Sequence, residues 1–229
     1  MSKKRKTVNS QLVKYPVLIV KPHNKEYQTD ERVNHFIMKA FGRGIAEYEA
    51  WPSKLPELVR NRAITEFLHS PTFKKKTHLF FLDSDTCPVN DFAIERLLSF
   101  GKDVIAGITP IVRVDNDIQC MWSAQKDDEY YGWDDLPKTL FKADRIGGTT
   151  LLLSRKVLEK LEPPYQITEY NDNMTNVKLS EDYYFSDKIK KAGFDIWVDP
   201  DTVCHHYHMF NLLEIYNIWK QCQKKIYTK

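Results

Sequence analysis

The sequence lacks the features that would place it in a membrane or in an oxidising compartment. Its four cysteines form no C-x-x-C pair, which argues against a structural zinc site and against a disulfide framework. No apolar run approaches the roughly 18 residues of a membrane span. The basic N-terminus is not followed by the apolar core of a signal peptide. We therefore expect a cytoplasmic protein with reduced cysteines and no membrane span.

A strong charge imbalance is also absent. The formal net charge is +3, which does not by itself indicate a nucleic-acid partner. The positive charge is uneven, because Lys3-Lys4-Arg5-Lys6 opens the chain and Lys74-Lys75-Lys76 precedes an apolar run. We interpret residues 1–14 as a basic flexible tail that is solvated, with contact to an anionic partner as the alternative.

Hydrophobic residues are plentiful, at 42% of the 229 positions, and they fall into alternating strand and helix patterns. The predicted elements up to residue 108 are strands at 15–20, 44–50, 78–82 and 104–108, and helices at 29–42, 53–68 and 93–100. This alternation predicts an α/β protein with a mostly parallel sheet flanked by helices. Residues 110–145 show no clear period, and we expect loops and short antiparallel strands that form one wall of a cleft.

The predicted elements of the last third of the chain follow a glycine-marked turn at 147–150. They are a strand at 151–153, a helix at 154–161, a polar and mobile segment at 165–179, a helix at 181–192, short strands at 195–198 and 202–206, and an amphipathic helix at 209–225.

The most informative stretch is His78-Leu79-Phe80-Phe81-Leu82-Asp83-Ser84-Asp85, in which a buried-strand pattern runs into two carboxylates. In an open α/β sheet, ligands bind at the carboxyl ends of the strands. Asp83 and Asp85 therefore suit a hard divalent cation such as Mg²⁺ or Mn²⁺. The alternative is a plain turn in which Asp83 caps the next helix. Two further D-x-D pairs, Asp115/Asp117 and Asp199/Asp201, do not follow such a strand.

Three other groups carry chemistry, each with a plainer alternative. Arg60-Asn61-Arg62 lies on the helix before the key strand, where an arginine fork could bind a diphosphate or could face solvent. Ser180-Glu181-Asp182 begins a helix, where the carboxylates could act as a general base or serve only the helix dipole. Cys204-His205-His206-Tyr207-His208 follows a strand, so His206 and His208 share one face and either could complete a metal site, or the cluster could be structural.

Taken in order, these residues resemble a glycosyltransferase of the GT-A fold, close to the family 2 type, over nearly the whole chain after about residue 15. The motifs that carry the resemblance are listed here in chain order: Arg60-Asn61-Arg62; Phe81-Leu82-Asp83-Ser84-Asp85; Val104-Ile105-Ala106-Gly107; Gly147-Gly148-Thr149; Leu151-Leu152-Leu153-Ser154-Arg155; Ser180-Glu181-Asp182-Tyr183-Tyr184-Phe185; Ala192-Gly193-Phe194-Asp195-Ile196-Trp197-Val198-Asp199-Pro200; and Cys204-His205-His206.

The resemblance implies a role for each group. Asp83 and Asp85 match the metal-binding D-x-D pair, with His206, or else His208, as a further metal ligand. Asp182 matches the catalytic base, and Glu181 is its neighbour. The residues implied for the nucleotide-sugar site are Lys21, Pro22, His23, Arg62, Asp83 and Ser84. One departure concerns the second strand, which in family 2 usually ends with an aspartate that contacts the base, whereas here we find only Glu47, Tyr48 and Glu49.

We therefore expect a single GT-A domain at 15–229, with a nucleotide-sugar-binding half at 15–108 and an acceptor and catalytic half at 109–229. The expected reaction is Mn²⁺- or Mg²⁺-dependent transfer of a sugar from a nucleotide-diphosphate donor, which we expect to be UDP-linked, to an acceptor hydroxyl with inversion. The acceptor is open between a saccharide, a protein, a small molecule and a hydroxylated nucleic-acid base. The alternatives are a nucleotidyltransferase and a non-catalytic sugar-nucleotide-binding module.

Overall fold

The computed structural model describes residues 14–23, 29–53, 55–114, 118–207 and 220. Its helices are α1 (Glu31–Gly42), α2 (Pro56–His69), a 3₁₀ turn η1 (Pro71–Phe73), α3 (Ala93–Ser99), α4 (Arg155–Leu158) and α5 (Glu181–Lys191). Its strands are β1 (Val17–His23), β2 (Ala46–Pro52), β3 (His78–Phe81), β4 (Thr86–Pro88), β5 (Val104–Ile108), β6 (Pro110–Val114), β7 (Ile118–Lys126), β8 (Glu129–Gly132), β9 (Phe141–Ala143), β10 (Arg145–Ile146), β11 (Leu151–Ser154), β12 (Glu169–Tyr170), β13 (Val177–Leu179) and β14 (Ile196–His206).

The main sheet has eight strands in the order β2-β1-β3-β11-β5-β14-β4, with β9 pairing to β14. Strand β1 runs parallel to β2 and β3, and β14 runs parallel to β5. Strand β11 is antiparallel to both β3 and β5, so β3 and β5 point the same way. Five strands therefore share one direction, which confirms the expected mostly parallel sheet. The insertion of a reversed strand at its centre was not expected.

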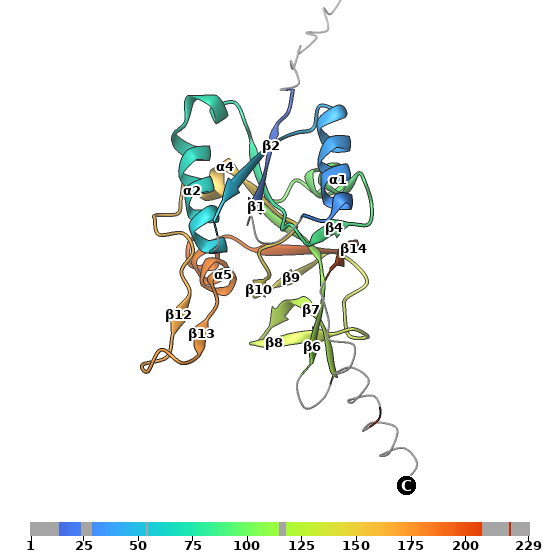
Figure 1. Cartoon of the computed structure of the whole chain (residues 1–229), viewed down its shortest axis with the longest axis vertical. Helices are drawn as coiled ribbons and strands as arrows, with labels where there is room; N and C mark the ends of the chain where they lie inside the picture. Colours follow the sequence, from blue (N-terminus) through green and yellow to red (C-terminus); the bar gives the residue numbers. More distant parts are fainter. Residues whose placement is uncertain (1–13, 24–28, 54, 115–117, 208–219, 221–229) are drawn as a thin grey trace, which may run out of the picture.

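Helices cover both faces of this sheet, with α2 and α1 on opposite sides in Figure 1. Alternate residues of β1 point to the two faces, as the period of a strand requires. Leu18 and Val20 pack in a core that includes residues of α2, α4 and α5, whereas Val17 and Ile19 pack with α1 and α3. Helix α1 begins at Asp30, whose side chain accepts a hydrogen bond from the Arg32 amide at 2.9 Å, as a helix N-cap should.

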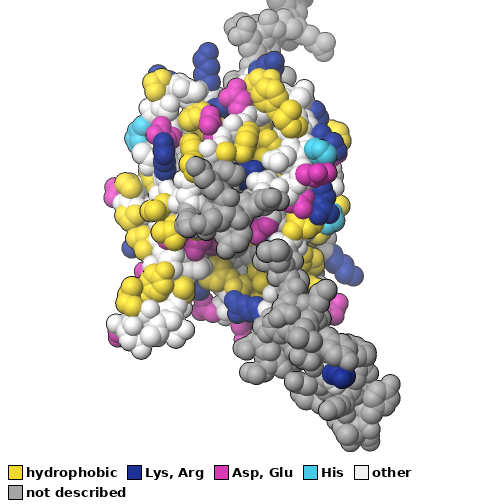
Figure 2. All heavy atoms as spheres, in the orientation of Figure 1, with side chains coloured by type: hydrophobic (Ala, Val, Ile, Leu, Met, Phe, Trp, Pro, Cys, Tyr) yellow, Lys and Arg dark blue, Asp and Glu magenta, His cyan; other side chains and the backbone are white. Residues whose placement is uncertain are grey.

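The segment at 110–145 forms the expected antiparallel strands, assembled as a second sheet in the order β10-β7-β6 with β8 paired to β7. It lies below the main sheet in Figure 1. Residues 165–179, expected to be mobile, instead contain the β12–β13 hairpin. The Asn171 side chain closes its turn by accepting from the amides of Thr175 at 2.9 Å and Asn176 at 3.1 Å. Exposed hydrophobic side chains of this hairpin are visible at the lower left of Figure 2.

Several boundaries differ from the prediction. The two short strands expected at 195–206 are one strand, β14, with a register shift between Val198 and Val203. Asp83 does not cap a helix, because β4 follows the D-x-D loop. The predicted helix at 209–225 lies outside the described residues, apart from Lys220. None of the helices in the described part of the chain has the length and apolar character to cross a membrane.

Candidate functional site

The D-x-D loop is fixed where β3 ends. The Ser84 carbonyl accepts from the Asp30 amide at 3.1 Å, which ties the loop to the start of α1. The Asp85 carbonyl accepts from the Tyr207 amide at 2.8 Å, which ties it to the end of β14. The side chains of Asp83 and Asp85 are 30% and 46% exposed, so neither carboxylate is buried.

A buried arginine lies behind this loop. Arg60 of α2 is only 2% exposed, and its Nη2 donates to both carboxylate oxygens of Asp83, at 2.9 and 3.1 Å. Its Nη1 donates to Oδ1 of Asp182 and lies 3.6 Å from Oε1 of Glu181. Because a buried charge must be paired, this guanidinium draws carboxylates from β3 and α5 to one point.

The glycine turn before β11 makes room for this cluster. The Gly148 backbone amide acts to lower the pKa of the Asp182 carboxyl. A Cβ atom at Gly148 would overlap Oδ1 of Asp182 and Nη1 of Arg60, and it would lie 2.6 Å from Cζ of Arg60. The next residue, Thr149, accepts from the Asp83 amide through its Oγ1 at 3.2 Å. Glycine is therefore required at position 148 for the close approach of Asp182 to Arg60.

Burial changes the acidity of the cluster. It raises the pKa of Asp182, although the Arg60 charge works in the opposite direction. Burial also raises the pKa of Glu181, and the neighbouring Asp182 charge adds to that effect. Burial disfavours the charge on Arg60, but the carboxylates of Asp182, Asp83 and Glu181 together raise its pKa, so it stays charged. A carboxylate with a raised pKa is a stronger proton acceptor, which suits a general base.

Asp85 faces His206 across 3.9 Å, measured from Oδ2 to Nε2. The His206 Nδ1 lies 2.9 Å from the Pro110 carbonyl oxygen, to which only a protonated Nδ1 can donate. In neutral imidazole that bond fixes Nε2 as the acceptor, which is how metal-binding histidines are usually oriented. Two bonds of about 2.1 Å would span up to about 4.2 Å, so the pair fits a divalent cation.

The described residues contain no cluster of three or more His, Cys, Asp or Glu side chains that could hold a metal ion by themselves. A cation at Asp85 and His206 would therefore need further ligands. Mg²⁺ is commonly bound in this way, through one or two carboxylates together with phosphate oxygens and water. The residues present thus fit a metal that arrives with, or is completed by, a phosphate-containing ligand.

The other residues of the predicted arginine and histidine motifs lie around the cluster formed by Arg60 and its carboxylates, or outside the described residues. Arg62 is exposed, because it lies about 200° around α2 from Arg60, and the structure does not bring it to the carboxylates. Asn61, between them, anchors the loop after α4: its Oδ1 accepts from the amides of Tyr165 at 2.7 Å and Gln166 at 3.0 Å. On β14, His205 is exposed and His206 half-buried, as the predicted alternation requires. His208 lies outside the described residues.

The predicted base-binding turn ends β1. Burial lowers the pKa of Lys21, whose Nζ donates to Thr29 Oγ1 at 2.7 Å and to Asn34 Oδ1 at 3.3 Å. Pro22 is half-buried, and the His23 side chain is not among the described parts. The Lys21 ammonium also lies 5.6 Å from the centre of the Tyr48 ring on β2. The nucleotide-binding roles of these residues remain predictions.

The other D-x-D pairs do not enter the site. Asp199 is buried and accepts from Arg96 Nε at 2.5 Å and from Thr202 Oγ1 at 2.5 Å. Asp201 pairs with the same arginine at 2.7 Å. This pair therefore holds α3 against β14. Asp115 and Asp117 lie outside the described residues.

Comparison with known proteins gives the family of the chain. The family model described as glycosyltransferase like family 2 matches residues 49–228. The chain belongs to this family, and glycosyl transfer is its general chemistry. No curated protein sequence matched.

Similar solved structures include the crystal structure of A197 from STIV, with a TM-score of 0.59 and 19% identity over 84% of this chain and 86% of that one. The catalytic domain of Drosophila beta1,4galactosyltransferase 7, in complex with xylobiose, has a TM-score of 0.47 and 12% identity over 84% and 71%. The inositol-1-phosphate CTP transferase from T. maritima has a TM-score of 0.43 and 10% identity over 88% and 94%. The mixed α/β fold, with a large mostly parallel sheet flanked by helices, is consistent with the expected GT-A type.

Sequence reasoning named the Arg60-Asn61-Arg62 motif but chose Arg62 as the ligand-binding residue. The helical spacing of the buried residues already indicated that Arg60 is buried. Arg60, Ala63, Ile64 and Phe67 are spaced i, i+3, i+4 and i+7, and all are buried. A charged residue on the apolar face of a helix requires a buried partner, and the partners here are the carboxylates of the site.

Proposed function

We propose that this protein transfers a sugar, with inversion, from a UDP-linked sugar to an acceptor hydroxyl in a metal-dependent reaction. The observation that carries the proposal is the meeting of Asp83, Asp182 and Glu181 on the buried Arg60, beside the Asp85–His206 pair. The two groups of residues have different chemistry. The carboxylates around Arg60 can accept a proton, and the Asp85–His206 pair can hold a cation against a diphosphate.

Asp182 is the proposed general base. Arg60 donates a hydrogen bond to its carboxylate, which also lies close against Gly148, so the group is held in one orientation. It removes the proton from the acceptor hydroxyl as that oxygen attacks the anomeric carbon, and the nucleotide diphosphate leaves on the opposite face. Glu181, the neighbouring carboxylate on α5, is the alternative base.

Asp85 and His206 are the proposed metal ligands, with Asp83 and His208 as further candidates. When bound, Mn²⁺ or Mg²⁺ would offset the charge that develops on the diphosphate leaving group. Asp83 accepts both of its hydrogen bonds from Arg60, so its carboxylate is held beside the proposed metal site. Lys21, Pro22, His23, Arg62 and Ser84 are proposed to contact the nucleotide sugar.

In this proposal, residues 15–108 supply the nucleotide-sugar half and residues 109–229 supply the base and the acceptor wall. Nucleotidyl transfer has less support, because such enzymes usually carry a glycine- and arginine-rich phosphate loop after the first strand. Lys21-Pro22-His23-Asn24 is not such a loop. We propose that the protein acts in the cytoplasm.

The proposal is tested by a screen of sugar nucleotides with Mn²⁺, which reads both the thermal shift and the slow hydrolysis of the donor. One UDP-sugar should stabilise the protein and be hydrolysed, and EDTA should abolish the hydrolysis. Asp85→Asn should nearly abolish it while leaving the melting temperature of the ligand-free protein unchanged. Full hydrolysis in EDTA, or a fully active Asp85→Asn variant, would contradict the mechanism.

A further inference from the structure

One face of the small antiparallel sheet is unusually polar. Arg113 of β6 pairs with Gln119 of β7, and Gln125 of β7 pairs with Tyr130 of β8. Directly paired residues share a face, and so do residues two apart on one strand. Gln125 and Tyr130 therefore project from the same side of the sheet. Strand β7 has a register shift between Met121 and Gln125, so Arg113 is placed on that side by its contact with the Tyr130 side chain and not by strand alternation. That side faces α5, because the Tyr130 ring packs on Tyr183 of α5 with centroids 6.1 Å apart.

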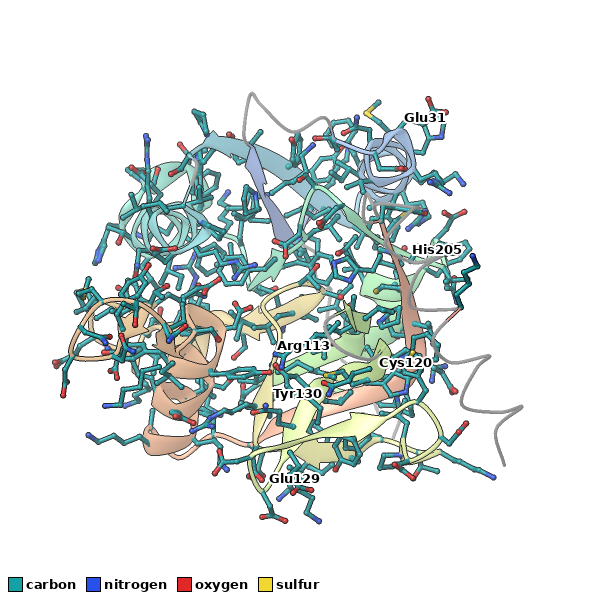
Figure 3. All side chains as sticks on the ribbon, turned by 60° about the horizontal axis from the view of Figure 1, so that its bottom comes forward. Glu31, Arg113, Cys120, Glu129, Tyr130 and His205 are labelled. Atoms are coloured by element: carbon teal, nitrogen blue, oxygen red, sulfur yellow. The ribbon has the colours of Figure 1, made fainter. Side chains whose placement is uncertain are left out.

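These side chains form a connected group next to the proposed base. Arg113 Nη2 donates to the Tyr130 hydroxyl at 3.2 Å, and the guanidinium carbon lies 5.1 Å from the centre of the Tyr130 ring. In Figure 3, Arg113 and Tyr130 lie next to each other at the centre of the molecule. Tyr183 directly follows Asp182 on α5, so the group continues to the proposed catalytic carboxylate.

The charge of Arg113 is not neutralised by any described carboxylate within 4.0 Å, and its side chain is exposed. Arg145, on the neighbouring strand β10, provides the contrast. It pairs with Asp187 at 2.8 Å and also with Asp128. Glu129 is next to Tyr130 in sequence but points to the other face, and it lies at the lower edge of Figure 3, away from Arg113. Among the described residues of this face, Arg113 therefore offers an exposed guanidinium, whereas the charge of Arg145 is paired.

A buried acceptor of hydrogen bonds lies on the same face. Gln125 is 5% exposed, and its Oε1 has no hydrogen-bond donor among the described residues. Leaving such a group unpaired costs about 1–3 kcal/mol, so a hydroxyl donated by a ligand would be stabilising here. The face thus combines a cation, two aromatic rings and a buried amide oxygen. Such a set of groups matches a polyhydroxylated ring that carries an oxyanion.

We propose that this face binds the acceptor and that Arg113 selects acceptors with a carboxylate or phosphate beside the ring. The inference rests on the proposed function for the identity of the site. The Tyr130–Tyr183 pair packs against the acceptor ring, Gln125 accepts one of its hydroxyl hydrogens, and Arg113 pairs with the oxyanion. A neutral saccharide loses the charge-assisted bond.

The test compares the affinities of two pairs of probes, and the members of each pair differ in one anionic group. The binding of p-nitrophenyl β-glucuronide and p-nitrophenyl β-glucoside, and of glucose 6-phosphate and glucose, is measured by calorimetry with UDP and Mn²⁺ present. At least one anionic probe should bind about tenfold to a hundredfold more tightly than its neutral twin, the usual range for a hydrogen bond to a charged group. The first pair tests a carboxylate and the second a phosphate.

The variants separate this proposal from the proposed function. Arg113→Gln should remove the preference, Arg113→Lys should retain part of it, and Tyr130→Phe should weaken it by releasing the guanidinium. Lys156→Gln removes an equal charge from α4, where the Lys156 Nζ lies 2.7 Å from the Asp103 carboxylate, and it should leave the preference intact. If no anionic probe is preferred by the wild type, or if Arg113→Gln keeps the preference, the proposal is wrong.

Donor hydrolysis is measured on the same proteins in the absence of any acceptor. Lys156→Gln should hydrolyse the donor at the wild-type rate, because Lys156 lies on α4 and pairs with Asp103. Absence of donor hydrolysis in the wild type would refute the proposed function while leaving the probe comparison to decide on Arg113.

Discussion

The substitution Gly148→Ala tests the central cluster with a single methyl group. The added Cβ would lie 2.6 Å from Cζ of Arg60, whereas ordinary contacts begin at 3.4 Å, so the guanidinium must move by roughly 0.8 Å. The Asp182 carboxylate is overlapped as well and must move with it. A displacement of about 1 Å at a catalytic group costs on the order of 10²-fold in rate. We therefore expect turnover of the donor to fall by about that factor.

Stability should fall in the same variant. Overpacking a filled site costs about 1–3 kcal/mol, and loss of a partner from a buried ion pair costs about 3–5 kcal/mol. Because the ion pair is displaced and not removed, we expect about 3 kcal/mol. For a chain of this size, that corresponds to a lowering of the melting temperature by about 6–12 °C. Donor affinity in the presence of Mn²⁺ should change little, because Asp85 and His206 are not displaced.

The matched control is Gly147→Ala, one residue earlier in the same turn. Its added Cβ would meet Ser123 Cβ at 3.3 Å, a contact that a small shift relieves. This variant should lose less than about 1 kcal/mol and keep its turnover. Thermal melts and donor-hydrolysis rates of both variants measure these differences. If Gly148→Ala keeps wild-type turnover and stability, the proposed packing of Asp182 against Arg60 is wrong.

Four further results are expected. His206→Ala should raise the Mn²⁺ concentration needed for activity, and added metal should partly rescue the rate. His205→Ala should leave the metal requirement unchanged. If a metal titration of the rate showed an equal effect of both substitutions, the assignment of His206 to the metal site would be wrong. Asp182→Asn should keep donor binding but lose turnover by about 10² to 10⁴; if Glu181→Gln carries that loss instead, Glu181 is the base. Burial raises the pKa of Asp182 above its ordinary value of 3.8, so the base loses its charge at a higher pH than a free aspartate does. The rate should therefore fall with decreasing pH at values above 3.8. A rate that stays constant down to pH 3.8 would contradict the assignment of Asp182 as the base. Asp199→Ala should lower the free energy of unfolding by about 3 kcal/mol, the low end for a buried pair because its arginine partner is partly exposed. Unchanged donor affinity in the same variant would separate this structural role from a catalytic one.

The sequence was sufficient to predict the elements that depend on local pattern. Apolar runs ended by glycine, proline or aspartate correspond to β1, β3 and β5, and the apolar stripe of α1 is the face it buries. Strand alternation also placed His205 and His206 on opposite sides correctly. These features succeed because period and punctuation are properties of a few neighbouring residues.

The position of β11 and the burial of Arg60 were not predicted, and for a common reason. Both depend on segments far apart in the sequence. Leu152 pairs with Phe80 and Ile105 at once, and Arg60 reaches a carboxylate 122 positions away. The hairpin at 169–179 was missed for a different reason, since its turn is closed by one asparagine side chain and not by an apolar pattern.

The reversed strand β11 has a consequence for how the chain folds. Strands β3 and β5 belong to the first 108 residues but are not neighbours, because β11 from the second half lies between them. A chain that stops at residue 108 cannot close its sheet, and we expect such a fragment to remain unfolded. Completion of the sheet must wait until residues 151–154 return, so β3 and β5 gain their pairing late and over a long loop, which favours slow folding. The strand that joins the halves follows the Gly148 turn, so the insertion of β11 into the sheet also brings Gly148 and Thr149 to the candidate site.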